Sequence, residues 1–114
     1  MKSLLTLLAV ACFAAACAYV DATTTQYVGV PRFPPSDPKT VQVLRAEPTQ
    51  GLYDRLGEIL LDISVDPPAD IAEVEQRLRE EGAKWGANAV FVVRDQVMPG
   101  VGRKLIGVAI RYRS

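Results

Sequence analysis

The sequence predicts a small α+β domain of order β-β-α-β-β, with one helix packed on a mostly antiparallel sheet. Two observations lead to this fold class. Apolar and polar residues alternate over residues 57–65 and 104–113, which is the pattern of strands that bury one face. Between them, residues 71–85 repeat apolar residues at helical spacing. A helix that covers one face of a sheet buries both patterns.

The first half of the domain is expected to hold two strands. Residues 41–46 alternate and stop before Pro48, where the segment Pro48-Thr49-Gln50-Gly51 is typical of a turn. Residues 52–56 are expected to form a helical turn or a loop. The second strand, over residues 57–65, should bury one face made of Ile59, Leu61, Ile63 and Val65.

The helix is expected to begin in the segment Asp66-Pro67-Pro68-Ala69-Asp70. Asp66 can act as the N-cap, and proline is tolerated in the first turn of a helix. Gly86 is placed to end the helix in the left-handed conformation. The buried stripe should consist of Ile71, Val74, Leu78 and Trp85.

The last part of the chain is expected to be an antiparallel hairpin over residues 89–112, with its turn at residues 98–102. Residues 89–93 are continuously apolar, and residues 104–113 alternate. Gly107 and Ala109 fall on the second face of the last strand, where their small side chains would let another backbone approach closely. We therefore take Gly107 and Ala109 as candidate contacts with a partner or with a second copy of the chain.

The N-terminus has the pattern of a secretory signal peptide. One lysine, Lys2, precedes an uncharged apolar run over residues 4–16, which ends in three alanines before Cys17. This run would span about 20 Å as a helix, which is too short to cross a bilayer core of about 30 Å. The segment resembles the lipobox of bacterial lipoproteins, in which the cysteine is lipidated and becomes the first residue of the mature protein. The resemblance implies a multiply acylated Cys17, which anchors stably.

Two other cleavage sites stay open. Cys12 follows Ala9-Val10-Ala11, which is also similar to a lipobox, and cleavage after Ala18 would release a soluble protein into the periplasm. In the lipoprotein family, a residue other than aspartate after the cysteine implies sorting to the outer membrane, and Ala18 fits this.

Three segments follow from these observations: a signal peptide over residues 1–16, a lipidated Cys17 with a Pro/Thr-rich tether over residues 17–40, and the α+β domain over residues 41–114. The tether contains four prolines and three consecutive threonines, so we expect an extended, partly polyproline-like spacer. Its contour could reach on the order of 70 Å at about 3.1 Å per residue.

The composition favours binding over catalysis. The chain has no histidine, so a Ser-His-Asp triad and the common zinc sites are excluded. With 13 basic and 13 acidic residues, it has no net charge that favours nucleic acid. A small enzyme would use Glu58, Asp62 and Asp66 for acid–base chemistry. Structural roles on an exposed strand face and at a helix cap explain these three residues better. We expect no enzyme activity, no cofactor and no metal.

Two segments carry a further resemblance, namely Leu56-Gly57-Glu58-Ile59 and the stretch from Pro67 to Gly86-Ala87-Asn88-Ala89-Val90. They resemble the RcsF-like periplasmic lipoprotein domain and the wider YbjQ-like group, over about residues 41–112. The chain lacks the cysteines of the RcsF disulfides. The resemblance implies the fold and the compartment.

The sequence therefore predicts a non-catalytic lipoprotein of the outer membrane that faces the periplasm and acts as a binding or envelope-sensing module through contacts with an envelope protein. The alternative is a self-assembling, ligand-binding module of the YbjQ-like type.

Overall fold

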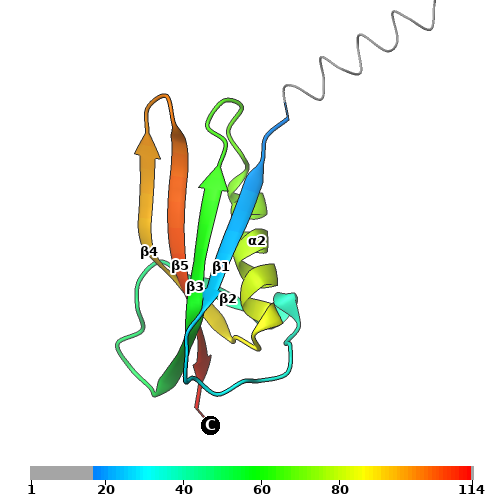
Figure 1. The fold of residues 1–114 in the computed structure, drawn as a ribbon, viewed down its shortest axis with the longest axis vertical. Helices are drawn as coiled ribbons and strands as arrows, with labels where there is room; N and C mark the ends of the chain where they lie inside the picture. The colour runs from blue at the N-terminus through cyan, green and yellow to red at the C-terminus, as the bar shows by residue number, and fades with distance from the viewer. Residues whose placement is uncertain (1–16, 114) are drawn as a thin grey trace, which may run out of the picture.

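A twisted five-stranded sheet carries an α-helix on one of its faces (Figure 1). This computed structural model describes residues 17–113, so the expected signal peptide over residues 1–16 lies outside the described residues. The elements are β1 (Val20–Gln26), the 3-10 helix η1 (Pro38–Thr40), β2 (Gln42–Leu44), β3 (Tyr53–Ile63), α2 (Ile71–Lys84), β4 (Ala89–Met98) and β5 (Gly102–Tyr112). The predicted α+β class is confirmed.

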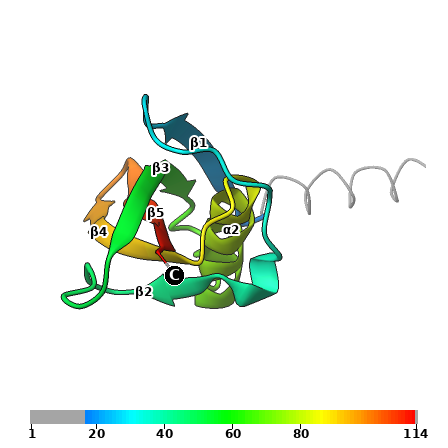
Figure 2. The ribbon, with the colours of Figure 1, turned by 90° about the horizontal axis from the view of Figure 1, so that it is seen from below.

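The strand order in the sheet is β1-β3-β5-β4-β2. Neighbouring strands are antiparallel except for β2, which runs parallel to β4. The predicted hairpin of β4 and β5 is present, and β2 is the short strand expected before Pro48. Seen along the strands, α2 lies against one side of the sheet, with β1 near one flank of the helix and η1 near the other (Figure 2).

Residues 20–40 belong to the domain, which corrects the expectation of an extended spacer over residues 17–40. Val20–Gln26 forms β1, an edge strand in which Val20 lies opposite Ile63. Three of its seven residues are consecutive exposed threonines, which favour strands without marking a buried face, so the strand shows little alternation of apolar and polar residues.

The chain between β1 and β2 also packs on the domain. The backbone N–H of Ser36 donates to the carbonyl of Ala83 at 2.8 Å, and its hydroxyl donates to the carbonyl of Ala87 at 2.8 Å. Phe33 packs against the core. Contacts of this kind fix a proline-containing segment that has no regular period of its own.

Strand β3 begins at Tyr53, so the expectation of a helical turn or loop over residues 52–56 is wrong. The register with β5 shifts between Arg55 and Gly57, which leaves Leu56 at a bulge. Leu56 is fully buried. Because a bulge places two successive residues against one partner, it interrupts the alternation from which a strand is recognised.

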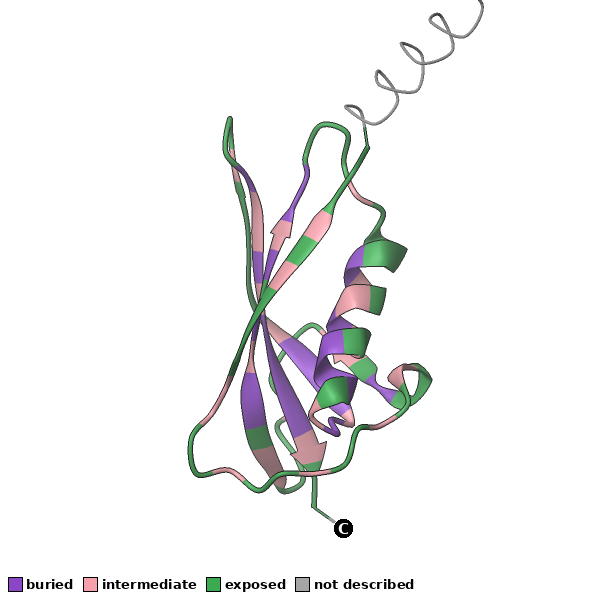
Figure 3. Cartoon of the chain, turned by 45° about the vertical axis from the view of Figure 1, so that its right-hand side comes forward, coloured by how far each residue is buried: buried purple, intermediate pink, exposed green. Residues whose placement is uncertain are grey.

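The main core lies between the sheet and α2 (Figure 3). As predicted, Ile59, Leu61 and Ile63 are buried there, together with Val74 and Leu78 of the helix. Each side chain of this size gains about 1.5–3 kcal/mol when it leaves water completely. Val65, in contrast, is 40% exposed, because it lies beyond the end of β3.

Gly107 and Ala109 are buried beneath α2, which corrects their assignment as exposed contacts. Ala109 has no exposed surface and belongs to the main core. A Cβ on Gly107 would lie 2.8 Å from Cγ1 of Val90 and 3.2 Å from Cδ2 of Leu78. The two small residues therefore let the helix of the same chain approach the sheet.

The helix begins at Ile71 with Asp70 as its N-cap, so the expected cap at Asp66 is wrong. An isolated bridge between Val65 and Pro68 holds this segment as a turn instead. Ile71 is 62% exposed and lies outside the buried stripe. At the other end, Gly86 has φ 79°, the left-handed conformation predicted for the residue that follows the helix.

A second, smaller core lies on the sheet face away from α2. Ala89, Phe91, Val108 and Ile110 are buried there, and Tyr27, Leu44 and Tyr53 pack against them. Together the two cores bury both faces of the sheet near the lower end of Figure 1, while the upper strand ends carry more exposed residues (Figure 3).

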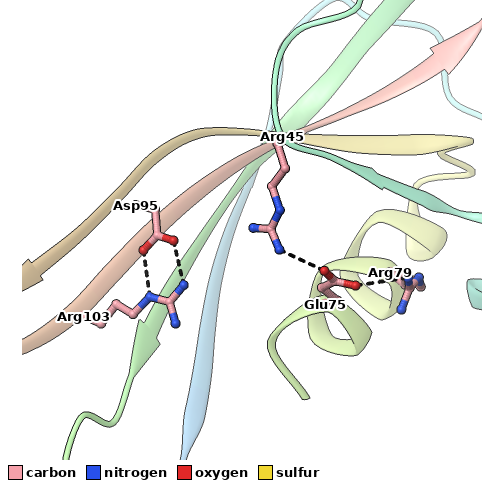
Figure 4. A network of polar contacts seen from close by, with 5 residues as sticks. All are labelled: Arg45, Glu75, Arg79, Asp95 and Arg103. Carbon is pink, nitrogen blue, oxygen red and sulfur yellow. Dashed lines mark hydrogen bonds and ion pairs between the residues drawn. The ribbon is translucent and has the colours of Figure 1, made fainter. Parts of the chain in front are cut away.

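Ion pairs join the short edge strand β2 to the helix (Figure 4). Arg45, just after β2, donates to Glu75 of α2 at 2.9 Å, and Arg79 contacts the same carboxylate at 3.4 Å. Arg79 also donates to the backbone carbonyl of Val41 at 3.2 Å. These contacts hold a strand of three residues that has few ladder hydrogen bonds of its own.

The pair of Asp95 and Arg103 makes part of the stability depend on pH. Arg103 donates two hydrogen bonds to this carboxylate, at 2.7 and 2.6 Å, and they lower the pKa of Asp95 below its ordinary value of 3.8 (Figure 4). A carboxyl with a lowered folded-state pKa stabilises the fold above its unfolded pKa and loses that contribution as the pH falls through the folded one. We expect Asp95→Asn to reduce the free energy of unfolding at pH 7 by on the order of 0.5 kcal/mol, because the pair is partly exposed.

Urea unfolding of both proteins between pH 7 and pH 2 checks this. The difference in the free energy of unfolding between wild type and Asp95→Asn should shrink below about pH 4, the ordinary range of an aspartate. A difference that stays constant down to pH 2 would show that the charge of Asp95 contributes nothing.

Candidate functional site

Cys17, the predicted lipidation site, lies at the start of the described chain and is exposed. It precedes β1 by three residues. The backbone N–H of Tyr19 donates to the Ser64 hydroxyl at 2.9 Å, and the carbonyl of Tyr19 accepts from the Ser64 N–H at 3.0 Å. The chain is therefore fixed to the domain from Tyr19 onward, and Cys17 lies within three residues of the sheet end where Val20 pairs with Ile63. This is the upper end of the sheet in Figure 1.

At the opposite end of the sheet, aromatic and arginine side chains gather where β3 and β5 pair. We call this region the distal surface, and it comprises Leu52, Tyr53, Arg55, Arg111, Tyr112 and Arg113. The register places Tyr53 opposite Tyr112, and their rings meet edge to face with centroids 6.2 Å apart. Two strands far apart in the sequence thus build one surface.

Glu47 organises one side of the distal surface. The hydroxyl of Tyr53 and the guanidinium of Arg55 both donate to Oε1 of Glu47. These hydrogen bonds lower the pKa of the Glu47 carboxyl, and the bond to Glu47 raises the pKa of the Tyr53 hydroxyl. The Arg55 guanidinium also lies 5.7 Å from the ring centroid of Phe91, which completes a fixed arrangement over the second core.

Arg111 organises the other side, below the end of α2. Its Nη1 donates to the carbonyl of Gly86 at 2.8 Å, and its guanidinium lies 4.5 Å from the ring centroid of Phe33. A cation is favourable at the C-terminal end of a helix, where carbonyl groups lack partners within the helix. Arg111 therefore joins the helix end, the segment that carries Phe33 and strand β5.

Arg113 and Tyr112 form the outer rim of the same surface. Arg113 pairs with Asp54 at 2.8 Å and remains 58% exposed, so its charge is available to a partner. The backbone N–H of Tyr112 donates to Oδ1 of Asn88 at 2.7 Å. An open hollow lies beside these groups, and it is lined by Phe33, Asp54, Arg111, Tyr112 and Arg113.

The carboxylates considered for catalysis do not meet at one place. Asp62 pairs with Lys104 at 2.8 Å, while Asp66 lies exposed in the segment between β3 and α2. Glu58 is on the same strand as Asp62 but four residues away, which is about 13 Å along a strand. Among residues 17–113, no group of three His, Cys, Asp or Glu side chains could hold a metal ion.

Sequence reasoning missed the distal surface. Its residues are spread over the turn after β2, the start of β3 and the end of β5, and they meet only through the strand register. The signal that could have found them is a pair of short aromatic-basic runs, Tyr53-Asp54-Arg55 and Arg111-Tyr112-Arg113, at the ends of neighbouring strands. Assigning residues 52–56 to a turn or loop concealed the first of them.

Comparisons with known proteins identify the fold alone. No protein-family model matches the chain, and no curated protein matches it. Among solved structures, the Francisella virulence factor FvfA is similar, with a TM-score of 0.56 and 13% sequence identity, over 82% of this chain and 98% of that chain. FvfA thus provides an experimental example of this α+β fold. In the part of the chain that the structure describes, no helix is long and apolar enough to span a membrane.

Proposed function

We propose that this protein is a non-catalytic lipoprotein of the outer membrane that is anchored through Cys17 and binds an envelope protein through its distal surface. The single observation that carries the binding role is the placement of exposed arginine and tyrosine side chains at the end of the sheet opposite Cys17. Tyrosine and arginine are enriched among the residues that dominate protein–protein binding energy. An anchor at one end leaves the other end directed away from the bilayer.

The character of the distal surface supports a pre-formed interface. Arg55, Arg111 and Tyr53 are each held by a hydrogen bond or ring contact within the chain, so little side-chain entropy remains to be lost on binding. Leu52 is 70% exposed beside them and would supply an apolar contact. We also propose that the chain is a divergent relative of the RcsF-like and YbjQ-like domains, on the strength of residues 86–90.

The segment Gly86-Ala87-Asn88-Ala89-Val90 has fold-forming roles that support this relationship. Gly86 ends the helix with φ 79°. Asn88 binds the backbone of β5 through its side chain, and its N–H donates to the carbonyl of Ile110 at 2.9 Å. This connection from α2 to the buried strand β4 fixes the angle between the two elements. Its role is structural, since it supports the distal surface.

Self-assembly is the second candidate, and one observation favours it. Strand β1 is at the edge of the sheet and is seven residues long, with Asp21 as its charged residue. An exposed edge strand with few charges can pair with the edge of another chain. Assembly would then proceed through β1, since Gly107 and Ala109 are buried by the helix of the same chain.

Photo-crosslinking in intact cells tests the binding role. A photoreactive amino acid at Leu52 should give an adduct with one envelope protein, because Leu52 is exposed within the distal surface. The matched control is Val93, which is 55% exposed on β4, far from that surface, and should give little adduct.

The result that would contradict the binding role is an equal yield of adducts from Leu52 and Val93. An adduct of twice the chain mass from a photoreactive residue at Thr23 on β1 would instead favour self-assembly.

A further inference from the structure

The distance between the predicted anchor and the folded domain is very short. Both backbone groups of Tyr19 are hydrogen-bonded to Ser64, so only Cys17 and Ala18 remain between the lipid and the fixed chain. Two residues span at most about 7 Å. The polar layer on each side of a bilayer is roughly 5–8 Å thick, given about 40–45 Å in total and a core of about 30 Å. A lipidated Cys17 therefore holds this end of the domain against the headgroups.

Two connections lie at the same end of the sheet as Cys17. Register places Val20 opposite Ile63, Ile63 opposite Arg103, and Arg103 opposite Val97, so these four residues form one row across the sheet. The β4–β5 turn and the segment between β3 and α2 both continue beyond this row. Figure 1 shows both connections at the upper end, beside the point where the chain enters β1.

This end exposes large apolar side chains that the domain leaves uncovered. Val101 is 67% exposed in the β4–β5 turn, and Val97 is 60% exposed beside it. Ile71 is exposed at the start of α2. Val65 is exposed directly after Ser64, and Tyr19, which is hydrogen-bonded to Ser64, is exposed as well. Single exposed apolar residues are ordinary, but a group at one end of a domain marks an interaction surface.

The charges at this end favour an apolar contact over an electrostatic one. Residues 97–102, which comprise the end of β4, the β4–β5 turn and the first residue of β5, carry no charged side chain. Arg103 and Lys104, which follow the turn, are paired with Asp95 and Asp62. Asp66 and Asp70 are exposed in the neighbouring segment and would be repelled by anionic headgroups. The uncharged turn and Val65, which precedes the acidic residues, can therefore enter the interface, while the carboxylates of Asp66 and Asp70 stay in the headgroup water.

We propose that the domain sits end-on against the bilayer, with the β4–β5 turn at Val101 and the segment at Val65 inserted among the headgroups. This inference rests on the proposed anchor at Cys17 and names the surface that the anchor brings to the lipid. In this orientation the domain contacts the bilayer directly and does not stand on a long stalk. The distal surface then faces away from the membrane and is separated from it by the length of the sheet.

Fluorescent labelling of the full, lipidated chain tests this orientation. Val101→Cys and Val65→Cys are each labelled with the environment-sensitive fluorophore NBD and reconstituted into vesicles of phosphatidylethanolamine and phosphatidylglycerol. The matched control is Val28→Cys, which is fully exposed at the opposite end of the domain. We expect the emission at Val101 and Val65 to shift to shorter wavelength, and to be quenched by shallow spin-labelled lipids several-fold more than at Val28.

The anchor and the orientation fail in different ways. If the parent chain itself takes up the label at Cys17, or does not float with the vesicles, the anchor is wrong and this inference is overturned with it. If the chain floats and Cys17 is blocked, but Val101 and Val65 respond no more than Val28, the anchor stands and the end-on contact is overturned. Two labelled positions are used so that misfolding of one variant does not decide the result.

Discussion

Cys17→Ser is expected to move the protein from the membrane fraction to the soluble periplasmic fraction almost completely. Serine cannot form the thioether that carries the lipid, and each buried methylene group of an acyl chain contributes about 0.8 kcal/mol to membrane binding. Two or three chains would therefore account for the whole of the stable anchoring, and the exposed apolar residues that are proposed to face the membrane would not replace them. Fractionation of cells that express each variant, followed by flotation, measures the effect.

Cys12→Ser is the matched control for this experiment. Cys12 lies within the apolar run that is expected to be removed, so its replacement should leave the protein in the membrane fraction. If Cys12→Ser releases the protein and Cys17→Ser does not, the anchored residue is Cys12. If neither variant leaves the membrane, the chain is held by something other than a lipid on cysteine.

Gly107→Ala is expected to reduce the free energy of unfolding by about 1–3 kcal/mol, the usual cost of inserting a methyl group into a packed core. The new Cβ would lie 2.8 Å from Cγ1 of Val90, a fully buried residue that cannot turn away. Urea unfolding followed by the fluorescence of Trp85 measures the change, in a Cys17→Ser background that needs no detergent.

A double-mutant cycle shows whether the effect comes from this contact. Val90→Ala alone should cost on the order of 2 kcal/mol, because it leaves a cavity under α2. In the double variant the methyl group added at position 107 fills part of that cavity, so the loss should be smaller than the sum of the single losses by about 1 kcal/mol. If Gly107→Ala has no effect on stability, the residue is not covered by the helix as the structure describes.

Strands that alternate apolar and polar residues could be predicted from the sequence, whereas strands without this alternation could not. Ile59, Leu61 and Ile63 alternate with polar residues, and a single apolar-polar period identifies both the strand and its buried face. Val20–Gln26 has no such period, because an edge strand that pairs on one side can remain mostly exposed. The bulge at Leu56 concealed the first part of β3 in a similar way.

The face on which small residues lie was predicted wrongly for a related reason. The alternation in β5 was assigned correctly as two faces, but the face with the larger residues was taken as the one under the helix. The structure places Gly107 and Ala109 under α2 and the bulkier Val108 and Ile110 in the second core. A helix can approach a sheet closely only where the sheet carries small residues. Gly107 and Ala109 therefore indicated close packing of α2 on the sheet, and they did not indicate a free surface.

Local sequence patterns predict the candidate site less well than they predict the fold, because the residues of the distal surface lie far apart in the sequence. Cys17 is proposed as the lipidation site from local sequence alone, since a leader of this type is read as a linear motif. The distal surface could not be identified in this way, because residues such as Tyr53 and Tyr112 are brought together only by the register of β3 and β5. The short distance between Cys17 and the sheet was not predictable either, because it depends on the two hydrogen bonds between Tyr19 and Ser64.

The intact mass of the mature protein purified from membranes tests the lipid anchor at Cys17 directly. We expect a chain that begins at Cys17 and carries the added mass of a diacylglyceryl group and of an acyl chain on its new amino terminus. A mass that corresponds to an unmodified chain beginning at Tyr19, or to one that retains residues 1–16, would contradict this expectation.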